Sequence, residues 1–382
     1  MKITAIISEY NPFHNGHLYH LEQAKKETDG DFYITVMSGN FVQRGQTALF
    51  DKYERAKIAI TAGFDAVIEL PTIFAVNNAE RFAYGAIRLL KNIPELTLSF
   101  GSEAGSTDKL KYIADFTESE EYADVLKSEL SSGISYPVAC NNALKKLLKS
   151  DILDGSNNIL AVEYIKSINK MNANIALHTV KRVNNYNSDA VCNNFLSATA
   201  IRNLFTEDTA QVKAYMPDYS YDCLKNYVDN TERLQDFMLY KVFDTDKNAL
   251  AEIFDVTEGL ENRIKASIQN AKTYEEFIGS LSTKRYSASR INRIMLNILL
   301  NIKKTDMLMA SQSEYMNILA VKKGKTELLG YLNKYAKVIT KYADSAKLND
   351  SEKYLYDLDR KSEKLYALIK GQEANYNTVI VE

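Results

Sequence analysis

One N-terminal stretch decides the fold: Ala5-Ile6-Ile7-Ser8-Glu9-Tyr10-Asn11-Pro12-Phe13-His14-Asn15-Gly16-His17-Leu18-Tyr19-His20. The apolar run from Ile3 to Ile7 predicts a buried strand, the Asn11-Pro12 pair predicts a tight turn, and a helical pattern begins near Gly16. Where a strand gives way to a helix, an α/β fold binds phosphate, because backbone N–H groups and the helix dipole face the anion. Three of the chain's four histidines lie in this stretch.

His14 and His17 flank the predicted junction of strand and helix. Their imidazoles can hydrogen-bond to triphosphate oxygens as charge builds on the α-phosphorus, and Gly16 lets a nucleotide approach the backbone. A histidine pair at this spacing is also a common capping or core arrangement. A metal site is not predicted, because no carboxylate or cysteine pair with metal-ligand spacing lies nearby. The order His-Asn-Gly-His after a first strand resembles the HxGH signature of the nucleotidyltransferase superfamily, so we interpret His14 and His17 as catalytic.

Composition places the chain among ordinary globular proteins. It has 382 residues, a hydrophobic content of 46%, a charged content of 25% and a formal net charge of −2. The length favours two domains, and no apolar run reaches the length of a membrane span. The N-terminus enters a strand without a secretory signal pattern, so we expect a cytoplasmic protein with no membrane partner. Cys140, Cys192 and Cys223 lack any C-x-x-C spacing, which argues against a disulfide framework and a zinc site.

Residues 1–205 alternate strand-like and helix-like segments. This alternation predicts a Rossmann-like α/β domain, in which helices cover both faces of a parallel sheet and ligands bind beyond the carboxyl ends of the strands. The predicted strands are Ile3–Ser8, Phe32–Met37, Ala66–Glu69, Leu96–Phe100 and Ile175–Thr179, and the predicted helices are His17–Glu27, Lys52–Ala62, Ala79–Leu90 and Asn157–Ile168.

Residues 206–382 show mainly helical periodicity, which predicts an all-α C-terminal domain packed closely against the first, since no proline-rich linker separates them. The predicted helices are Leu224–Val242, Leu260–Ala271, Tyr274–Leu281, Ser289–Asn301, Thr326–Tyr342 and Ser351–Ile369. We therefore expect an α/β domain over 1–205 and a helical domain over 206–382.

A second motif, Ser197-Ala198-Thr199-Ala200-Ile201-Arg202, closes the predicted catalytic domain. Its hydroxyls can donate to the β- and γ-phosphates, and Arg202 can neutralise the leaving pyrophosphate. The alternative is a plain helix cap at Ser197 with a surface arginine. The motif resembles the ISSTxxR element of the same superfamily, with Leu196 in place of isoleucine and Ala198 in place of the middle serine.

Further segments point to one family within that superfamily. They are Ser38-Gly39-Asn40-Phe41-Val42-Gln43-Arg44-Gly45, Phe50-Asp51-Lys52-Tyr53-Glu54-Arg55-Ala56, Phe100-Gly101-Ser102-Glu103, Asn157-Asn158-Ile159-Leu160-Ala161-Val162-Glu163-Tyr164, Lys181-Arg182, Glu258-Gly259-Leu260-Glu261-Asn262-Arg263 and Thr283-Lys284-Arg285-Tyr286. With the N-terminal motif they resemble the tRNA(Met) cytidine acetate ligase family over nearly the whole chain. The resemblance implies a ligase that uses ATP, with Mg²⁺ on the phosphates, to make acetyl-adenylate from acetate. It implies transfer of the acetyl group to N4 of the wobble cytidine of elongator tRNA(Met), giving N4-acetylcytidine.

The resemblance also implies the ATP contacts. Gly101 would let a base or ribose lie against the strand end, Asn157 would read an adenine edge or ribose hydroxyl, and Arg182 would stack on adenine or bind phosphate. Each also has an ordinary structural reading, as a turn glycine, a capping asparagine and a surface arginine. The full expected set is Ile7, Ser8, Glu9, Tyr10, Asn11, Pro12, Phe13, His14, Asn15, Gly16, His17, Leu18, Tyr19, His20, Gly101, Asn157, Arg182 and Val183, joined by Ser197, Thr199 and Arg202.

For tRNA, the richest basic segment runs from Thr283 to Arg293. Basic side chains can follow phosphates and an aromatic ring can stack on a base, although a solvated helical face is the commoner explanation for such a run. The expected RNA-binding residues are Lys284, Arg285, Tyr286, Arg290 and Arg293. A second basic cluster is Lys322-Lys323-Gly324-Lys325.

Two other functions compete with an RNA-modifying ligase. A small-molecule adenylyltransferase that releases pyrophosphate could use the same two motifs, but it has no need of a large helical domain. An RNA-binding protein with a vestigial nucleotide fold is disfavoured by the intact histidine pair and Arg202. The identity of the acyl group and of the target nucleotide rests on the resemblance alone, and the sequence leaves the oligomeric state open.

Overall fold

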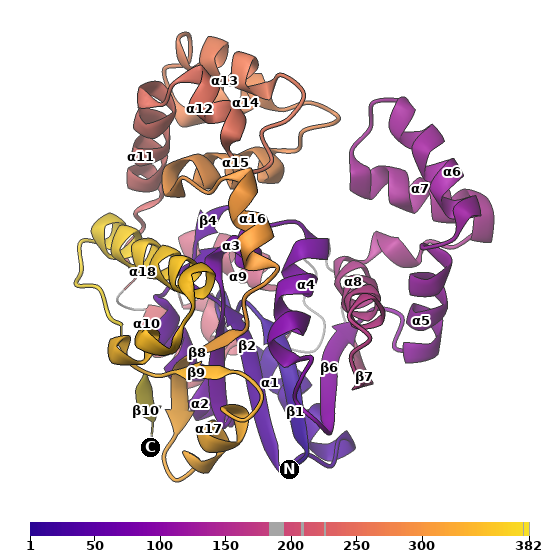
Figure 1. Ribbon diagram of the computed structural model, residues 1–382, viewed down its shortest axis with the longest axis vertical. Coiled ribbons are helices and arrows are strands. Elements are labelled where there is room, and N and C mark those ends of the chain that lie inside the picture. The colour runs from indigo at the N-terminus through magenta and orange to yellow at the C-terminus, as the bar shows by residue number, and fades with distance from the viewer. Residues whose placement is uncertain (183–194, 208–209, 225–226, 377, 382) are drawn as a thin grey trace.

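The computed structural model describes residues 1–182, 195–207, 210–224, 227–376 and 378–381 (Figure 1). The strands are β1 (Ile3–Ser8), β2 (Phe32–Ser38), β3 (Phe41–Val42), β4 (Gln46–Thr47), β5 (Ala66–Leu70), β6 (Leu96–Ser102), β7 (Ile175–Lys181), β8 (Tyr315–Lys322), β9 (Lys337–Ile339) and β10 (Val379–Val381). The helices are α1 (Asn15–Glu27), α2 (Lys52–Ala62), α3 (Thr72–Ala75), α4 (Ala79–Leu90), α5 (Thr107–Phe116), α6 (Glu120–Ser131), α7 (Tyr136–Leu148), α8 (Ser156–Lys170), α9 (Ala198–Glu207), α10 (Asp218–Leu224), α11 (Thr231–Asp244), α12 (Lys247–Glu252), α13 (Leu260–Ile268), α14 (Tyr274–Leu281), α15 (Ala288–Leu300), α16 (Lys304–Ala310), α17 (Glu327–Leu332) and α18 (Asp350–Lys370).

The main sheet has its first strand near the centre. Its order is β10-β8-β5-β2-β1-β6-β7, and β5, β2, β1, β6 and β7 are parallel. The chain builds outward from β1 through β2 to β5, then crosses to β6 and β7 on the other side. Such a reversal opens a crevice at the carboxyl ends of the strands where the two halves meet, here β1 and β6. The parallel sheet and all five strands predicted for residues 1–205 are confirmed.

Helices cover both faces of this sheet. On one face, α4 and α8 pack against alternate side chains of β1 and β2, such as Ala5 and Ile34. On the other face, α1 and α2 pack against Ile6 and Met37. Because strand side chains alternate between faces, each central strand contributes to both apolar clusters.

The second half of the chain is not entirely helical. β8 pairs antiparallel with β5, and β9 and β10 pair parallel with β8. This corrects the expectation of an all-α segment over 206–382. The apolar pattern of Tyr315–Val321 fits a strand buried in the sheet, and the predicted helix Thr326–Tyr342 is instead the short α17 followed by β9. No described helix is both long and apolar enough to cross a membrane.

Two groups of helices extend beyond the layered core (Figure 1). Helices α11–α16, residues 231–310, form what we call the helical module, and its apolar core is continuous with that of the sheet. Helices α5–α7, which the sequence analysis did not predict, stand on the other side of the molecule. The β3–β4 hairpin meets the helical module: a Cβ on Gly45, which has φ +73°, would lie 2.5 Å from the backbone of Asn292 and Arg293.

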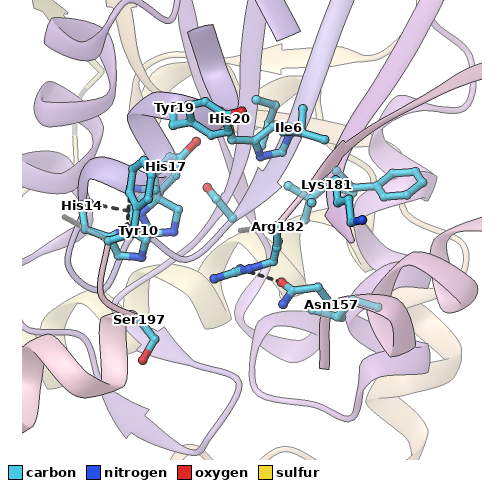
Figure 2. Close-up of a pocket in the computed structure, with 18 of the residues that line it drawn as sticks. Ile6, Tyr10, His14, His17, Tyr19, His20, Asn157, Lys181, Arg182 and Ser197 are labelled. Atoms are coloured by element: carbon cyan, nitrogen blue, oxygen red, sulfur yellow. Dashed lines mark hydrogen bonds between the residues drawn. The ribbon is translucent and has the colours of Figure 1, made fainter. Parts of the chain in front are cut away.

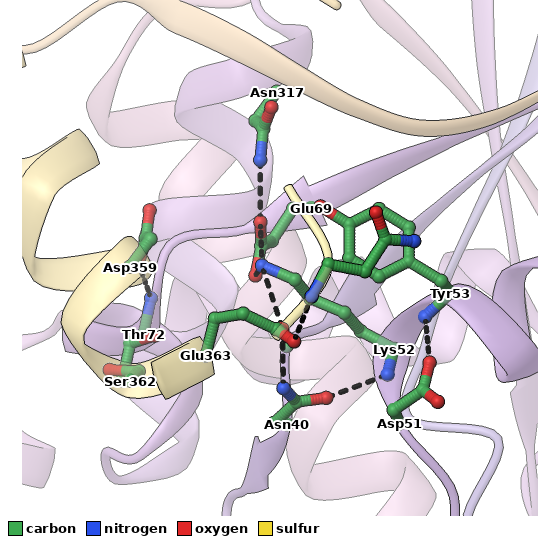
Figure 3. Close-up of polar contacts among 12 residues, drawn as sticks. Asn40, Asp51, Lys52, Tyr53, Glu69, Thr72, Asn317, Asp359, Ser362 and Glu363 are labelled. Atoms are coloured by element: carbon green, nitrogen blue, oxygen red, sulfur yellow. Dashed lines mark hydrogen bonds and ion pairs between the residues drawn. The ribbon is translucent and has the colours of Figure 1, made fainter. Parts of the chain in front are cut away.

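A buried ionic network ties the last helix to the core (Figure 3). The Lys52 ammonium lies 2.8 Å from Glu69 and 3.7 Å from Glu363 of α18, and all three side chains are at most 4% exposed. Asn40 donates to Glu363 and Asn317 donates to Glu69, both at 2.7 Å. Burial alone would lower the pKa of Lys52, but Glu69, Tyr53 and Glu363 together outweigh burial and raise that pKa. The single cation therefore compensates two buried acids drawn from distant parts of the chain.

Replacing Lys52 with Met should leave two buried carboxylates without their cation. Breaking a buried pair on one side typically costs about 3–5 kcal/mol of unfolding free energy. Urea unfolding followed by circular dichroism measures this loss. Lys57→Met, at an exposed position of the same helix, is the control and should lie within about 0.5 kcal/mol of the unmodified protein. Equal stabilities of the two variants would contradict a compensating role for Lys52.

Candidate active site

A pocket opens at the carboxyl ends of β1, β6 and β7, at the reversal point of the sheet (Figure 2). Most of the predicted nucleotide contacts meet there, although they come from segments far apart in the sequence. Its described lining is Ile6, Ile7, Ser8, Tyr10, His14, Gly16, His17, Tyr19, His20, Phe100, Gly101, Asn157, Leu160, Tyr164, Val180, Lys181, Arg182, Phe195, Leu196 and Ser197.

His14 and His17 form an unusual helix cap at the start of α1. The Nδ1 atom of His14 accepts from the N–H of Gly16 at 3.0 Å, and Nδ1 of His17 accepts from the N–H of His14 at 3.2 Å. The two rings stack with centroids 3.7 Å apart. Gly16 has a role that the sequence did not indicate, because a Cβ there would lie 2.9 Å from the His14 ring. The capping arrangement and the site are thus the same structure.

These contacts fix the tautomers of both rings. A backbone N–H only donates, so each Nδ1 must be the unprotonated acceptor and the ring proton of a neutral imidazole lies on Nε2. Burial, reinforced by Arg182 and Arg202, lowers the pKa of His14 to about 3. Burial and the neighbouring His14 lower the pKa of His17 well below its ordinary value. At neutral pH the pair therefore presents two Nε2–H donors.

Arg182 brings a cation to the opposite wall of the pocket (Figure 2). Its guanidinium donates to Oδ1 of Asn157 at 3.0 Å, and the amide nitrogen of Asn157 donates to Glu103 at 2.7 Å. Glu103 also accepts from the backbone N–H of Asn158 at the start of α8. Asn157, which was predicted to contact ATP, lines the pocket, and in this structure its amide orients Arg182. Val183, also predicted to contact ATP, lies outside the described residues.

One residue of the second motif, Ser197 to Arg202, lines the pocket, and others hold the elements around it. Ser197 lines the pocket and its Oγ accepts from the N–H of Ala200, so it also caps α9. Thr199 and Arg202 are not among the described lining residues. Arg202 donates to Oγ1 of Thr199 at 3.1 Å and to the carbonyl of Asn11 at 2.6 Å, which fastens α9 to the loop before His14.

Several residues of the predicted N-terminal ATP segment support the loop and are not among the lining residues. The Glu9 carboxylate accepts from the N–H of Gln43 in the β3–β4 hairpin at 2.7 Å, and Asn11 accepts from the N–H of Leu49 at 2.8 Å. Phe13 is buried in the core, and Asn15 donates to the carbonyl of Ala214. The others outside the described lining are Pro12 and Leu18.

One buried cation holds the loop ends together. Arg55 of α2 is 0% exposed and donates to the carbonyls of Glu9 at 2.6 Å, of Phe50 at 3.2 Å and of Gly39. The Glu9 carbonyl lies just beyond β1, the Gly39 carbonyl just beyond β2, and the Phe50 carbonyl just before α2. The carboxyl ends of the two strands are therefore fixed independently of any ligand.

The predicted RNA cluster is only partly available at the surface. Arg290 forms a two-pronged ion pair with Asp255 at 2.6 and 3.0 Å, and Arg293 donates to the carbonyl of Gln43. Tyr286 is 8% exposed. Lys284 and Arg285 are exposed, and Arg285 pairs with Glu258 at the surface.

The second basic cluster, Lys322–Lys325, lies at the opposite edge of the sheet from the pocket. It follows the end of β8, which pairs with the beginning of β5: Val321 lies opposite Ala66. Because β5 is parallel to β1, its beginning marks the amino edge of the sheet. This cluster therefore faces away from the strand ends that form the pocket.

Sequence reasoning missed the apolar wall of the pocket. Phe100, Leu160, Tyr164, Val180 and Phe195 line it, which suits a flat base better than a charged group. A local signal existed for some of them, since Phe100 and Val180 lie near the carboxyl ends of β6 and β7, next to Gly101 and Lys181-Arg182, which were already singled out. Leu160 and Tyr164 lie one turn apart on α8 and could be placed only once the helix was docked.

Comparisons with known proteins agree over almost the whole length. Residues 1–379 match the family model described as HIGH Nucleotidyl Transferase. A tRNA(Met) cytidine acetate ligase of Clostridium perfringens is 37% identical, over 97% of this chain and 96% of its own length. The protein of the same name from Caldicellulosiruptor saccharolyticus is 39% identical, over 96% and 94%. Crystal structures of Thermotoga maritima TmcAL, apo and bound with alpha-thio ATP, match with TM-scores of 0.91 and 0.89 at 31% and 32% identity, each over 100% of both chains.

The depressed pKa of His14 predicts a specific loss of stability in acid. With an ordinary pKa of 6.5 and a folded pKa of about 3, the stability it contributes is complete above 6.5 and is lost as pH falls from 6.5 toward 3. At pH 5 the loss from this residue is about 2 kcal/mol. His14→Asn keeps a capping acceptor but does not titrate, so its unfolding free energy should fall less between pH 8 and pH 5. Urea unfolding at the two pH values tests this, and an identical pH dependence would contradict it.

Proposed function

The chain belongs to the tRNA(Met) cytidine acetate ligase family of HIGH nucleotidyltransferases, and from this premise we propose how its residues divide the reaction. ATP and acetate react in the pocket to give acetyl-adenylate and pyrophosphate. The acetyl group then passes to N4 of the wobble cytidine of elongator tRNA(Met), in the cytoplasm. The observation that carries the proposal is the stacked pair of neutral histidines. They line the same pocket as Arg182, from the opposite wall.

The first step needs stabilisation of charge more than a covalent group. An acetate oxygen attacks the α-phosphorus, and negative charge builds on the phosphoryl oxygens as pyrophosphate leaves. His14 and His17 donate to those oxygens, and the N-terminus of α1 adds its dipole. Arg182, held by Asn157, neutralises charge from the other wall, while Ser197 and the start of α9 receive the departing phosphates. The apolar wall with Tyr164 takes the adenine.

Mg²⁺ would enter with the nucleotide. The described lining residues supply imidazole, guanidinium, amine, amide and hydroxyl groups and no carboxylate. Among the described residues there is also no cluster of His, Cys, Asp and Glu able to hold a metal. A hard cation prefers oxygen ligands, which the triphosphate offers and this lining largely does not. The ion would contribute shielding of phosphate charge, and the residues of the chain would bind the complex.

For tRNA, the proposal assigns the helical module to binding. Lys284 and Arg285 lie exposed between α14 and α15, whereas Tyr286 and Arg290 pair with acids inside that module and Arg293 donates to Gln43 of the β3–β4 hairpin. The β3–β4 hairpin links the module to the end of β1 through Gln43 and Glu9. A tRNA bound to the helical module would thus be connected to the pocket through the β3–β4 hairpin.

The purified protein should release pyrophosphate from ATP only when acetate is present, and mass spectrometry should find N4-acetylcytidine in elongator tRNA(Met) after incubation. His17→Ala removes one transition-state donor, so pyrophosphate release should fall about 10²–10³-fold while tRNA affinity changes little. Release that depends on a phosphorylated metabolite and not on acetate would instead support a small-molecule adenylyltransferase. Equal losses of catalysis and tRNA binding would contradict the role given to His17.

Replacing Lys284 and Arg285 together with Ala should weaken tRNA binding and reduce the slope of log affinity against log salt by about 1 for each lost phosphate contact. Lys323→Ala with Lys325→Ala, on the far edge of the sheet, provides the matched control and should leave the slope unchanged. Filter binding at several salt concentrations measures both. A reduced slope only in the control pair would move the RNA site to that edge.

A further inference from the structure

A chain of four polar side chains leads from the pocket wall to the surface. Nε2 of His20 lies 2.9 Å from Oγ of Ser99, and that oxygen lies 2.9 Å from Nδ1 of His178. Nε2 of His178 lies 2.8 Å from a carboxylate oxygen of Glu27. His20 lines the pocket, where Figure 2 places it beside Ile6 and Tyr19. Ser99 is fully buried, and the Glu27 side chain is 52% exposed.

The hydrogen bond at the exposed end of this series sets the direction of the others. When Nε2 of His178 donates to the Glu27 carboxylate, Nδ1 of a ring that carries one proton is left as an acceptor. The hydroxyl of Ser99 therefore donates to His178 and accepts from Nε2–H of His20. This leaves Nδ1 of His20 without a proton. Burial is the largest of the causes that lower the pKa of His20 to about 3, which agrees with a neutral His20 ring.

Only one of the two proposed steps releases a proton. Ionised acetate and ATP give acetyl-adenylate and pyrophosphate with no proton to remove. In the second step the cytidine amino nitrogen forms a bond to the acetyl carbon, the bond from that carbon to the AMP oxygen breaks, and the nitrogen must lose one proton. A pocket that excludes water during acyl transfer needs an outlet for it, because water would hydrolyse the adenylate.

We propose that His20, Ser99, His178 and Glu27 form a proton relay that serves the acetyl-transfer step, an inference that rests on the proposed function. Nδ1 of His20 takes the proton from the amino nitrogen. Nε2–H of His20 passes its proton to Ser99, Ser99 passes its own to Nδ1 of His178, and Nε2 of His178 gives its proton to the Glu27 carboxylate, which exchanges it with solvent. Four hydrogen atoms each move one place, and one proton leaves.

The relay also explains why polar side chains lie between α1 and the strands β6 and β7. α1 is already held to the sheet by the buried Leu21 and Ala24, so packing alone does not call for a buried serine between two histidines. The first and last groups of the relay, His20 and Glu27, both lie on α1, about two helical turns apart. Ser99 and His178 are direct partners in the β6–β7 register. Each link therefore lies on a rigid element.

The test measures the two steps separately in the full-length protein. Acetate-dependent pyrophosphate release reports the first step, and single-turnover acetylation of tRNA from added acetyl-adenylate reports the second. Glu27→Gln keeps an acceptor for His178 but cannot receive a proton, and Ser99→Ala interrupts the chain. Both should slow the transfer about tenfold or more, with pyrophosphate release and the KM for tRNA unchanged. Glu22→Gln, at an exposed position of the same helix, is the control and should match the unmodified protein.

Two results would overturn the relay. Unchanged transfer in Glu27→Gln would show that the exposed carboxylate takes no proton. Equal losses in both steps, with a lowered melting temperature, would show that the four groups only position α1. Failure of the proposed function is seen separately, because the unmodified protein would then release no pyrophosphate in response to acetate.

Discussion

The buried guanidinium of Arg55 is the constraint on which the site depends. Arginine keeps its charge in a protein, so a fully buried one must have its donors satisfied by acceptors. Here the acceptors are three main-chain carbonyls: those of Glu9 and Gly39, just beyond β1 and β2, and that of Phe50, just before α2. All three can accept from Arg55 only when both strands end at the right place relative to α2. The loop that carries His14 starts from one of them, at Glu9. The position of the histidines thus depends on a buried cation that is not among the described residues lining the pocket.

The pocket combines neutral donors with one restrained cation. Stacked histidines that were charged would repel each other, and burial removes that problem by keeping both rings neutral. Arg182 supplies positive charge, and its partner Asn157 limits where that charge can go. Such an arrangement is set before substrate arrives, so little reorganisation is needed as charge develops. Arg202 contributes indirectly, because it fastens α9 to the loop that both histidines follow.

Sequence patterns predicted many of the elements that depend on neighbours along the chain, although they missed α5–α7. The strands at Ile3–Ser8 and Leu96–Phe100 and the helix Lys52–Ala62 have clear periodicity, and the HxGH stretch located the pocket. The strand β8 was missed because its apolar run, interrupted by Asn317, lies among segments with helical periodicity and its partner β5 lies some 250 residues earlier. The working roles of Asn157 and Arg202 could not be derived either, since each is set by a tertiary partner. His20 was expected among the ATP contacts, and only the pairing of Ser99 with His178 connects it to solvent.

The contribution of the last third of the chain to the first sheet has a consequence for how the protein is made. As a ribosome synthesises the chain, β5 emerges long before β8, so one edge of the nascent sheet stays unpaired until residue 315 and beyond has left the exit tunnel. The buried pair of Lys52 and Glu69 likewise gains its third partner, Glu363, only near the end of translation. Completion of the sheet and of its buried ionic network therefore depends on the last part of the chain to be made. A chain truncated before residue 315 would keep β5 as an exposed edge strand, able to pair with other chains.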